Sequence, residues 1–211
     1  MRQDQSRLDI LEQLNLETVL IVNDWATKFL PQSYRDSQQD WFGKREISWH
    51  IAVVFRRVSG KLQSQAFVHI IQSCSQDSIA VMSIMQHVLK SLKSEYPEIR
   101  RAFFRQDNTS CYHCANTVLA YPLIEQLTSI KVARLDFGDP QGGKGPADRT
   151  AATCKSHIHI YINEGHNVTT AEEMKEALLS HGGVEGVRMT VLTTDATQEI
   201  PQQQKIPGTA N

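Results

Sequence analysis

Three aspartates could do chemistry together: Asp24, Asp107 and Asp148. Asp24 follows the apolar run at 18–22, Asp107 ends the short run FFRQD, and Asp148 falls in the first turn of a predicted helix. Close carboxylates repel one another, which raises their pKa values unless a cation neutralises them. Two Mg²⁺ or Mn²⁺ ions, roughly 4 Å apart on such oxygens, can activate a water and stabilise a leaving oxygen in phosphodiester cleavage. The three residues are therefore predicted catalytic and metal-binding residues.

An ordinary structural role competes for each residue. A single Asp at a strand end or helix start is usually a cap or a turn former. Three at equivalent positions of one topology are a rarer coincidence, which favours the metal site. Asp136 and Asp139 stay open as alternatives for the third ligand, although both precede the turn, where a side chain would more readily cap or bind Lys144.

The segment GDPQGGKG at 138–145 resembles a phosphate loop over its first seven positions. At the eighth position Gly145 lacks the hydroxyl that would bind Mg²⁺, and Pro146 removes the next backbone donor. The nucleotide interpretation is therefore weak. The glycines instead favour a sharp turn into a helix that presents Asp148 toward the other acids.

The elements that position these residues follow from the hydrophobic pattern. Strands are predicted near 18–22, 47–57, 62–73, 100–108 and 131–137, with helices after the third, fourth and fifth. Helical crossovers make the first, fourth and fifth strands parallel, and the hairpin of the second and third stacks on the other side of the first. The expected sheet order is 3-2-1-4-5, with a crevice between the ends of strands one and four. The stretch SHIHIYI at 156–162 alternates with period two and locally favours a strand over the predicted helix.

Three stretches carry a family resemblance: NDWATKFLP, FFRQDNTSCYH and DFGDPQGGKGPADRTAATCKSH. They resemble the catalytic motifs of DDE/D-type transposases that have an RNase H-like core. The resemblance implies an α/β fold with a five-stranded mixed sheet flanked by helices. It also implies Asp24, Asp107 and Asp148 as metal-binding catalytic residues for DNA strand cleavage and transfer. No zinc finger or helix-turn-helix is recognised upstream, so autonomous transposition is not expected.

The chain of 211 residues has a formal net charge of −1, which gives no global attraction to DNA or to anionic membranes. Four cysteines without a signal peptide or a membrane-spanning run indicate a reducing, nuclear or cytoplasmic location. DNA and, as an oligomer, a second copy of the chain are the expected partners, and no membrane is expected. The predicted organisation is an N-terminal segment (1–15), an RNase H-like catalytic domain (16–163), a small helix-strand appendage (164–194) and a disordered tail (195–211).

The CxxC of Cys111 and Cys114 could join Cys154 and either His157 or His159 in a structural zinc site. Buried thiols beside a helix start are the alternative, because a second CxxC or a paired-histidine motif is missing. A redox role is disfavoured, since no thioredoxin-like strand pattern precedes the motif.

Aromatic and basic residues flank the predicted site. Trp25, within an aromatic group that also includes Trp41, Phe42 and Trp49, could stack on splayed bases, although core packing is the commoner role. Lys144 and Arg149 are predicted phosphate or DNA contacts because they flank Asp148. The pairs Arg56–Arg57 and Arg100–Arg101 are expected at a solvated edge.

Two functions follow from these patterns. The first is a metal-dependent nuclease or transposase-like strand transferase with an Asp24, Asp107 and Asp148 site. The second is a transposon-derived protein that no longer cuts DNA and acts as a binding or scaffold module. The near-neutral charge favours the second, and the presence of all three acids favours the first.

Overall fold

The computed structural model describes residues 2–35, 44–138 and 145–193. One mixed sheet contains six strands in the order β5-β4-β1-β2-β3-β6. Their bounds are Thr18–Trp25 (β1), Ser48–Val58 (β2), Lys61–Ile71 (β3), Arg101–Asp107 (β4), Lys131–Gly138 (β5) and Val187–Val191 (β6). β4 is parallel to β1 and to β5, whereas β2 is antiparallel to β1 and β3. The predicted RNase H-like order 3-2-1-4-5 is therefore confirmed, and β6 extends it beyond β3.

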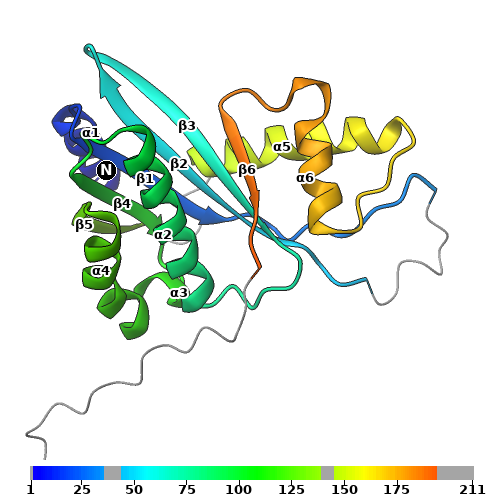
Figure 1. Cartoon of the computed structure of the whole chain (residues 1–211), viewed down its shortest axis with the longest axis horizontal. Coiled ribbons are helices and arrows are strands. Elements are labelled where there is room, and N and C mark those ends of the chain that lie inside the picture. Colours follow the sequence, from blue (N-terminus) through cyan, green and yellow to red (C-terminus); the bar gives the residue numbers. More distant parts are fainter. Residues whose placement is uncertain (1, 36–43, 139–144, 194–211) are drawn as a thin grey trace, which may run out of the picture.

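Helices cover both faces of the sheet (Figure 1). One face carries α2, α3 and α4, and the other carries α5 and α6, while α1 lies near the start of β1. The helices are Arg2–Gln13 (α1), Ser78–Glu95 (α2), Ser110–His113 (α3), Ala115–Thr128 (α4), Pro146–Asn163 (α5) and Ala171–Leu179 (α6), followed by the 3₁₀ turn Ser180–Gly182 (η2).

The alternation of side chains along the strands divides the core into two layers. In β2, Ala52 and Val54 face α2 and α4, whereas Ile51 and Val53 face α5 and α6. Because both faces are covered, the central strands are apolar on both sides, which explains the continuous apolar run that begins β1.

The segment 156–162 is helical, as predicted, despite its period-two pattern. Cys154, Ile158 and Ile162 follow one another at four-residue spacing and are all buried against the sheet. Ile160 is 53% exposed, so the alternation does not match the buried face. Helical spacing of the buried side chains therefore decides the local structure.

The segment predicted as an appendage holds α6 and β6. β6 pairs in parallel with β3, from Ala66 opposite Val187 to Ile70 opposite Val191. Met174 of α6 is fully buried in the same core layer as α5. These elements thus complete the main sheet and its core. The tail predicted to be disordered lies outside the described residues, and the domain boundaries stay predictions.

The prediction of a solvated edge is wrong for Arg56. Its residue exposure is only 8%, and its guanidinium carbon lies 3.3 Å from the centroid of the Tyr96 ring. Nη2 of the same side chain is 3.1 Å from Oε1 of Glu98. A planar cation can bury its stem while it stacks on an aromatic ring, which the sequence pattern alone did not indicate. Arg100 and Arg101 are exposed, as expected.

Candidate active site

The first two predicted acids lie at the ends of neighbouring parallel strands. Asn23 of β1 is paired in register with Gln106 of β4, and Asp24 and Asp107 are the next residues of the two strands. Side chains alternate along a strand, so Asp24 shares the α5 face with its β2 partner, Ile51. The strand order thus places both carboxylates at the same rim of the sheet.

The third predicted acid lies in the first turn of α5, and this helix contacts both β1 and β2. Gly145 caps this helix, Pro146 is its first residue, and Asp148 occupies the third helical position. Oδ2 of Asp148 accepts a hydrogen bond of 2.8 Å from the backbone N–H of Gly145. The carboxylate therefore has a structural role as part of a capping box, in addition to any role in chemistry.

Electrostatics connect the three acids. The pKa of Asp24 is raised from 3.8 to about 6, mainly by burial and then by the negative charges of Asp148 and Asp107. A hydrogen bond from the backbone of Trp25 acts in the opposite direction. Asp107 and Asp148 therefore both lie within electrostatic range of Asp24.

The acids are not gathered as tightly as metal ligands. In the part of the chain that the structure describes, no group of three or more His, Cys, Asp or Glu side chains has the arrangement of a metal site. Oδ1 of Asp107 instead accepts a hydrogen bond of 2.7 Å from the backbone N–H of Asn108. The metal-binding role of the three acids stays a prediction.

The other predicted contacts lie in different surroundings. Arg149 is exposed and follows Asp148 directly, whereas Lys144 lies outside the described residues. Trp25 is half-buried, and its ring meets that of His50 edge to face, with centroids 5.1 Å apart. Trp25 thus packs against the core, on the sheet face opposite to Asp24. Trp49 is fully buried, while Trp41 and Phe42 lie outside the described residues.

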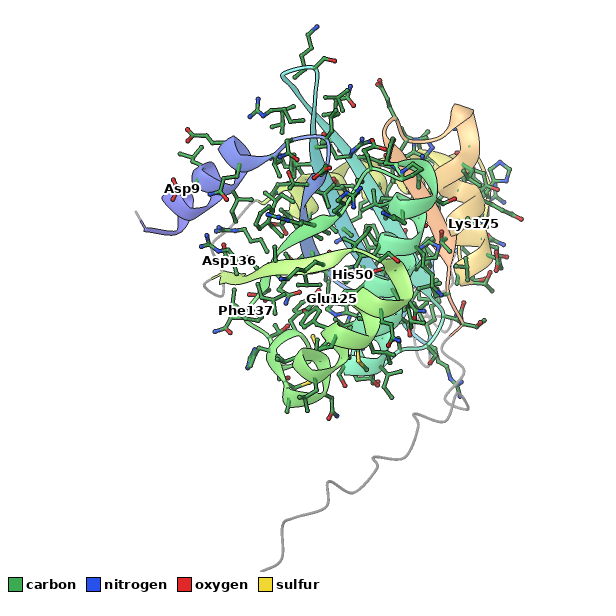
Figure 2. The ribbon with its side chains drawn as sticks, turned by 60° about the vertical axis from the view of Figure 1, so that its left-hand side comes forward. Asp9, His50, Glu125, Asp136, Phe137 and Lys175 are labelled. Carbon is green, nitrogen blue, oxygen red and sulfur yellow. The ribbon has the colours of Figure 1, made fainter. Side chains whose placement is uncertain are left out.

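A buried layer of polar side chains, which the sequence analysis missed, lies behind the acids on the α2 face. We call it the polar layer; its members are Asn23, Trp25, His50, His69, Gln106 and Tyr112, and each has at least one buried side-chain N or O atom without a partner among the described residues. Figure 2 shows His50 in the interior of the molecule. The alternation of β2 and β3 could have revealed it, because His50 and His69 fall on the inward face with Ala52 and Phe67.

Two histidines of the polar layer, His50 and His69, are linked to a third, His87, which lies nearer the surface. His50 is the register partner of His69, and Nε2 of His69 lies 3.0 Å from Nδ1 of half-buried His87. Burial lowers the pKa of His50 to about 3 and also lowers the pKa values of His69 and His87. The hydroxyl of Tyr112 is fully buried, and burial, followed by the charges of nearby acids that include Asp24, raises its pKa. The polar layer is therefore uncharged and electrostatically coupled to the acids.

The structure does not support the predicted zinc site. Cys111 packs against the core layer beneath α2 and α4, whereas Cys154 is buried in the opposite layer beneath α5 and α6. The sheet separates these thiols. Nε2 of His157 already lies 3.0 Å from the backbone oxygen of Ser180. A CxxC alone does not determine on which face of a sheet the remaining ligands fall.

A family model described as a domain of unknown function (DUF8701) matches residues 3–207. The chain belongs to this family. No curated protein matches the chain. No helix within the described residues has the length and apolar character needed to cross a bilayer.

Several solved nuclease structures show a distant likeness. The manganese-soaked nuclease domain of human cytomegalovirus terminase is 13% identical over 87% of this chain and 68% of that chain, with a TM-score of 0.32. Its inhibitor-bound form is 11% identical over 89% and 70%, with a TM-score of 0.31. NurA with manganese is 14% identical over 51% and 28%, with a TM-score of 0.19.

Proposed function

We propose that the protein is a divalent-metal-dependent enzyme that cleaves DNA strands, with Asp24, Asp107 and Asp148 as its catalytic residues. The observation that carries the proposal is the position of the acids: Asp24 and Asp107 end neighbouring parallel strands, and Asp148 lies in the first turn of α5. Burial, followed by the charges of Asp148 and Asp107, raises the pKa of Asp24 to about 6. Mutually repelling acids at adjacent strand ends cost stability, and a bound cation removes that cost. Perturbed carboxyl groups of this kind mark functional sites more often than ordinary surface positions.

The donor set fits a hard cation. Carboxylate oxygens are the ligands that Mg²⁺ and Mn²⁺ prefer, and Asp24, Asp107 and Asp148 would hold the ion or ions. When bound, two such ions supply water activation and stabilisation of the leaving oxygen. Asp148 can join the set once its oxygen turns from the Gly145 N–H, a hydrogen bond that water or the second carboxylate oxygen can replace.

The remaining residues support binding of a phosphodiester. Arg149 is exposed beside Asp148, where its guanidinium can contact a phosphate oxygen without displacing the acid. Lys144 is assigned the same role by its place in the loop before α5. Trp25 is better suited to holding the end of β1 in the core than to stacking on a base, because its ring packs on His50.

DNA as the substrate, and strand transfer as a second step, rest on the resemblance of the three motifs to DDE/D transposases. Because the net charge is −1, DNA contact has to come from a local cluster such as Arg149 and Lys144. Nuclear or cytoplasmic location and self-association belong to this proposal and are tested by localisation of the tagged full chain and by its mass in solution.

A binding or scaffold protein without cutting activity is the second candidate. Two observations favour it: Asp148 caps its own helix, and Asp107 accepts a backbone N–H, so both acids already have structural partners. In this case the acids are retained as caps, and the repulsion at Asp24 is a remnant of an ancestral site.

Titration of the full chain with Mn²⁺ in a calorimeter separates the two functions. The enzyme is expected to bind the ion and to nick supercoiled DNA with Mn²⁺, and Asp107→Asn is expected to abolish both. Asp136→Asn is the matched control: Oδ1 of Asp136 lies 2.7 Å from Nε of Arg134, and this variant also tests the alternative third ligand. Nicking that persists in Asp107→Asn would reject the catalytic assignment, and failure of the unaltered chain to bind Mn²⁺ would favour the scaffold.

A further inference from the structure

The two cysteines of the CxxC stand at the junction of two helices, directly after the acidic end of β4. Cys111 lies in α3, and Cys114 both ends α3 and caps the start of α4. The backbone N–H of Cys114 donates to the oxygen of Ser110 at 2.9 Å, which keeps this segment in a helical turn. Side chains three residues apart in such a turn are neighbours, with Cβ atoms about 5–6 Å apart. A disulfide needs Cβ atoms about 3.5–4.5 Å apart, so bond formation requires the backbone of this turn to close by about 1–2 Å.

Cys114 has the surroundings of a reactive thiol. It precedes the first turn of a 14-residue helix, where backbone N–H groups and the helix dipole favour negative charge. Oγ1 of Thr117 lies 3.3 Å from its sulfur. The hydrogen bond with Thr117 is the largest of the effects that together lower the pKa of Cys114.

The other described thiols differ from Cys114. Burial raises the pKa of Cys154 to about 12 and also raises that of Cys74. Cys154 lies on the buried face of α5 and is fully buried, so neither reagents nor a partner thiol can reach it. Reactivity follows thiolate character and access, which single out Cys114 among these three cysteines.

Thr117 connects the two cysteines. Its hydroxyl donates to the backbone oxygen of Cys111 at 2.7 Å, and the same proton can turn to the Cys114 sulfur, 3.3 Å away, when that sulfur is a thiolate. The sulfur of Cys111 lies 3.2 Å from Oγ1 of Thr109 and is half-buried. Cys111 is thus held beside Cys114 but does not cap the N-terminus of α4, as Cys114 does. This position suits a resolving thiol.

We propose that Cys114 and Cys111 form a reversible disulfide, with Cys114 as the attacking thiol and Cys111 as the resolving thiol. With a small disulfide such as oxidised glutathione, the Cys114 thiolate attacks one sulfur and releases one glutathione thiolate. The Cys111 thiolate then attacks the Cys114 sulfur of the mixed disulfide and releases the second. Two cysteine thiols are oxidised, one small disulfide is reduced to two thiols, and the two cysteine protons pass to solvent or to the leaving thiolates. The redox role that the sequence pattern disfavoured is therefore proposed here. The N-terminus of α4 stabilises the Cys114 thiolate without a thioredoxin-like strand pattern before the CxxC.

The pair is placed to act on the acidic site. Tyr112 lies between the two cysteines and is fully buried, with its ring centroid 6.1 Å from that of His50. Asp107 ends β4 three residues before Ser110 begins α3. A disulfide would restrain the turn that carries Tyr112. Because Tyr112 belongs to the polar layer, the disulfide would also restrain that layer behind Asp24. This consequence rests on the proposed function, whereas disulfide formation itself does not.

The test uses the reduced full chain, oxidised glutathione and intact-mass analysis. The expected product is a protein lighter by two hydrogen atoms. Peptide mapping is expected to show one disulfide bond, between Cys111 and Cys114. In Cys111→Ser the mixed disulfide with glutathione is expected to accumulate at Cys114, and Cys114→Ser is expected to remain unmodified at position 111. Alkylation of Cys114 at neutral pH is expected to be about tenfold or more faster than that of Cys74, because a lower pKa gives more thiolate.

Three results would overturn the inference: no loss of two hydrogens in the unaltered chain, a final product that retains glutathione, or accumulation of the mixed disulfide at position 111. Circular dichroism of each variant checks that it is folded, and the result for the unaltered chain stands without any variant. A separate Mn²⁺ titration of the oxidised and reduced forms is expected to give affinities that differ by at least threefold. Equal Mn²⁺ binding would reject coupling to the acids, and absence of binding in both forms would count against the proposed function but not against the disulfide.

Discussion

Asn23 of β1 lies opposite Gln106 of β4, and both side chains are only 2% exposed, directly before Asp24 and Asp107. The amides point into the α2 side of the sheet, and the acids point to the α5 side. A shift of β1 by one residue would turn Asn23 to the α5 side and Asp24 to the α2 side, into the polar layer. The pairing of two amides therefore decides where the acids lie.

Replacing Asp24 with Asn is expected to stabilise the fold and to abolish Mn²⁺ binding. The folded-state pKa of about 6 exceeds the unfolded value of 3.8, so the folded state retains the proton more strongly. The resulting stabilisation is complete below pH 3.8 and is lost as pH rises through about 6. Above that pH the Asn variant should be more stable by about 1–2 kcal/mol, after allowance for screening by solvent. Urea unfolding at pH 5 and pH 8 measures this; equal stability at pH 8 would contradict the raised pKa.

Asn23→Leu is expected to raise the melting temperature. Neither Nδ2 nor Oδ1 of Asn23 has a hydrogen-bond partner among the described residues, and a buried unpaired amide costs about 1–3 kcal/mol. Gln106→Leu is the matched comparison, because Nε2 of Gln106 donates to the Tyr121 hydroxyl at 3.3 Å and its loss leaves that oxygen without this donor. Calorimetric unfolding should therefore show a gain for Asn23→Leu and a smaller gain or a loss for Gln106→Leu. A fall for Asn23→Leu would show that ordered water satisfies its amide.

Mild acid is expected to destabilise the protein through the buried histidines. Their folded-state pKa values lie below 6.5, so their contribution to stability is complete above pH 6.5 and is lost as pH falls toward the folded values, about 3 for His50. Among the carboxyl groups of the described residues, only the shift of Asp24 acts in the opposite direction, and the three histidines outweigh it. His50→Leu should reduce the slope of unfolding free energy against pH by up to about 1.4 kcal/mol per pH unit between pH 6 and pH 4. Urea titrations at several pH values measure the slope, and an unchanged slope would place the His50 ring in contact with water.

Arg56→Lys is expected to destabilise the fold by about 1–2 kcal/mol, because a lysine cannot both stack on Tyr96 and retain the fork that binds Glu98. Arg100→Lys provides the control. Arg100 also pairs with a glutamate, Glu17, at 3.4 Å, but its side chain is 72% exposed, so little change is expected. Equal stability of the two variants in urea would show that burial of Arg56 contributes nothing.

The sequence by itself determined the strand order and the chain positions of the acids. Apolar runs and helical crossovers allow only a few right-handed topologies, so placing Asp24 and Asp107 at neighbouring strand ends required no coordinates. It also predicted a helix at α5, although the period-two pattern of 156–162 locally favoured a strand.

Only the tertiary structure decided what surrounds those acids. Pairing between β2 and β3 aligns His50 with His69, and α2 and α3 then add His87 and Tyr112 from segments distant in the sequence. It also separated Cys111 from Cys154 by the thickness of the sheet and buried Arg56 on Tyr96. Local patterns specify which face of an element is apolar, but the partner of a polar side chain depends on contacts between elements, and these form only when the layers pack.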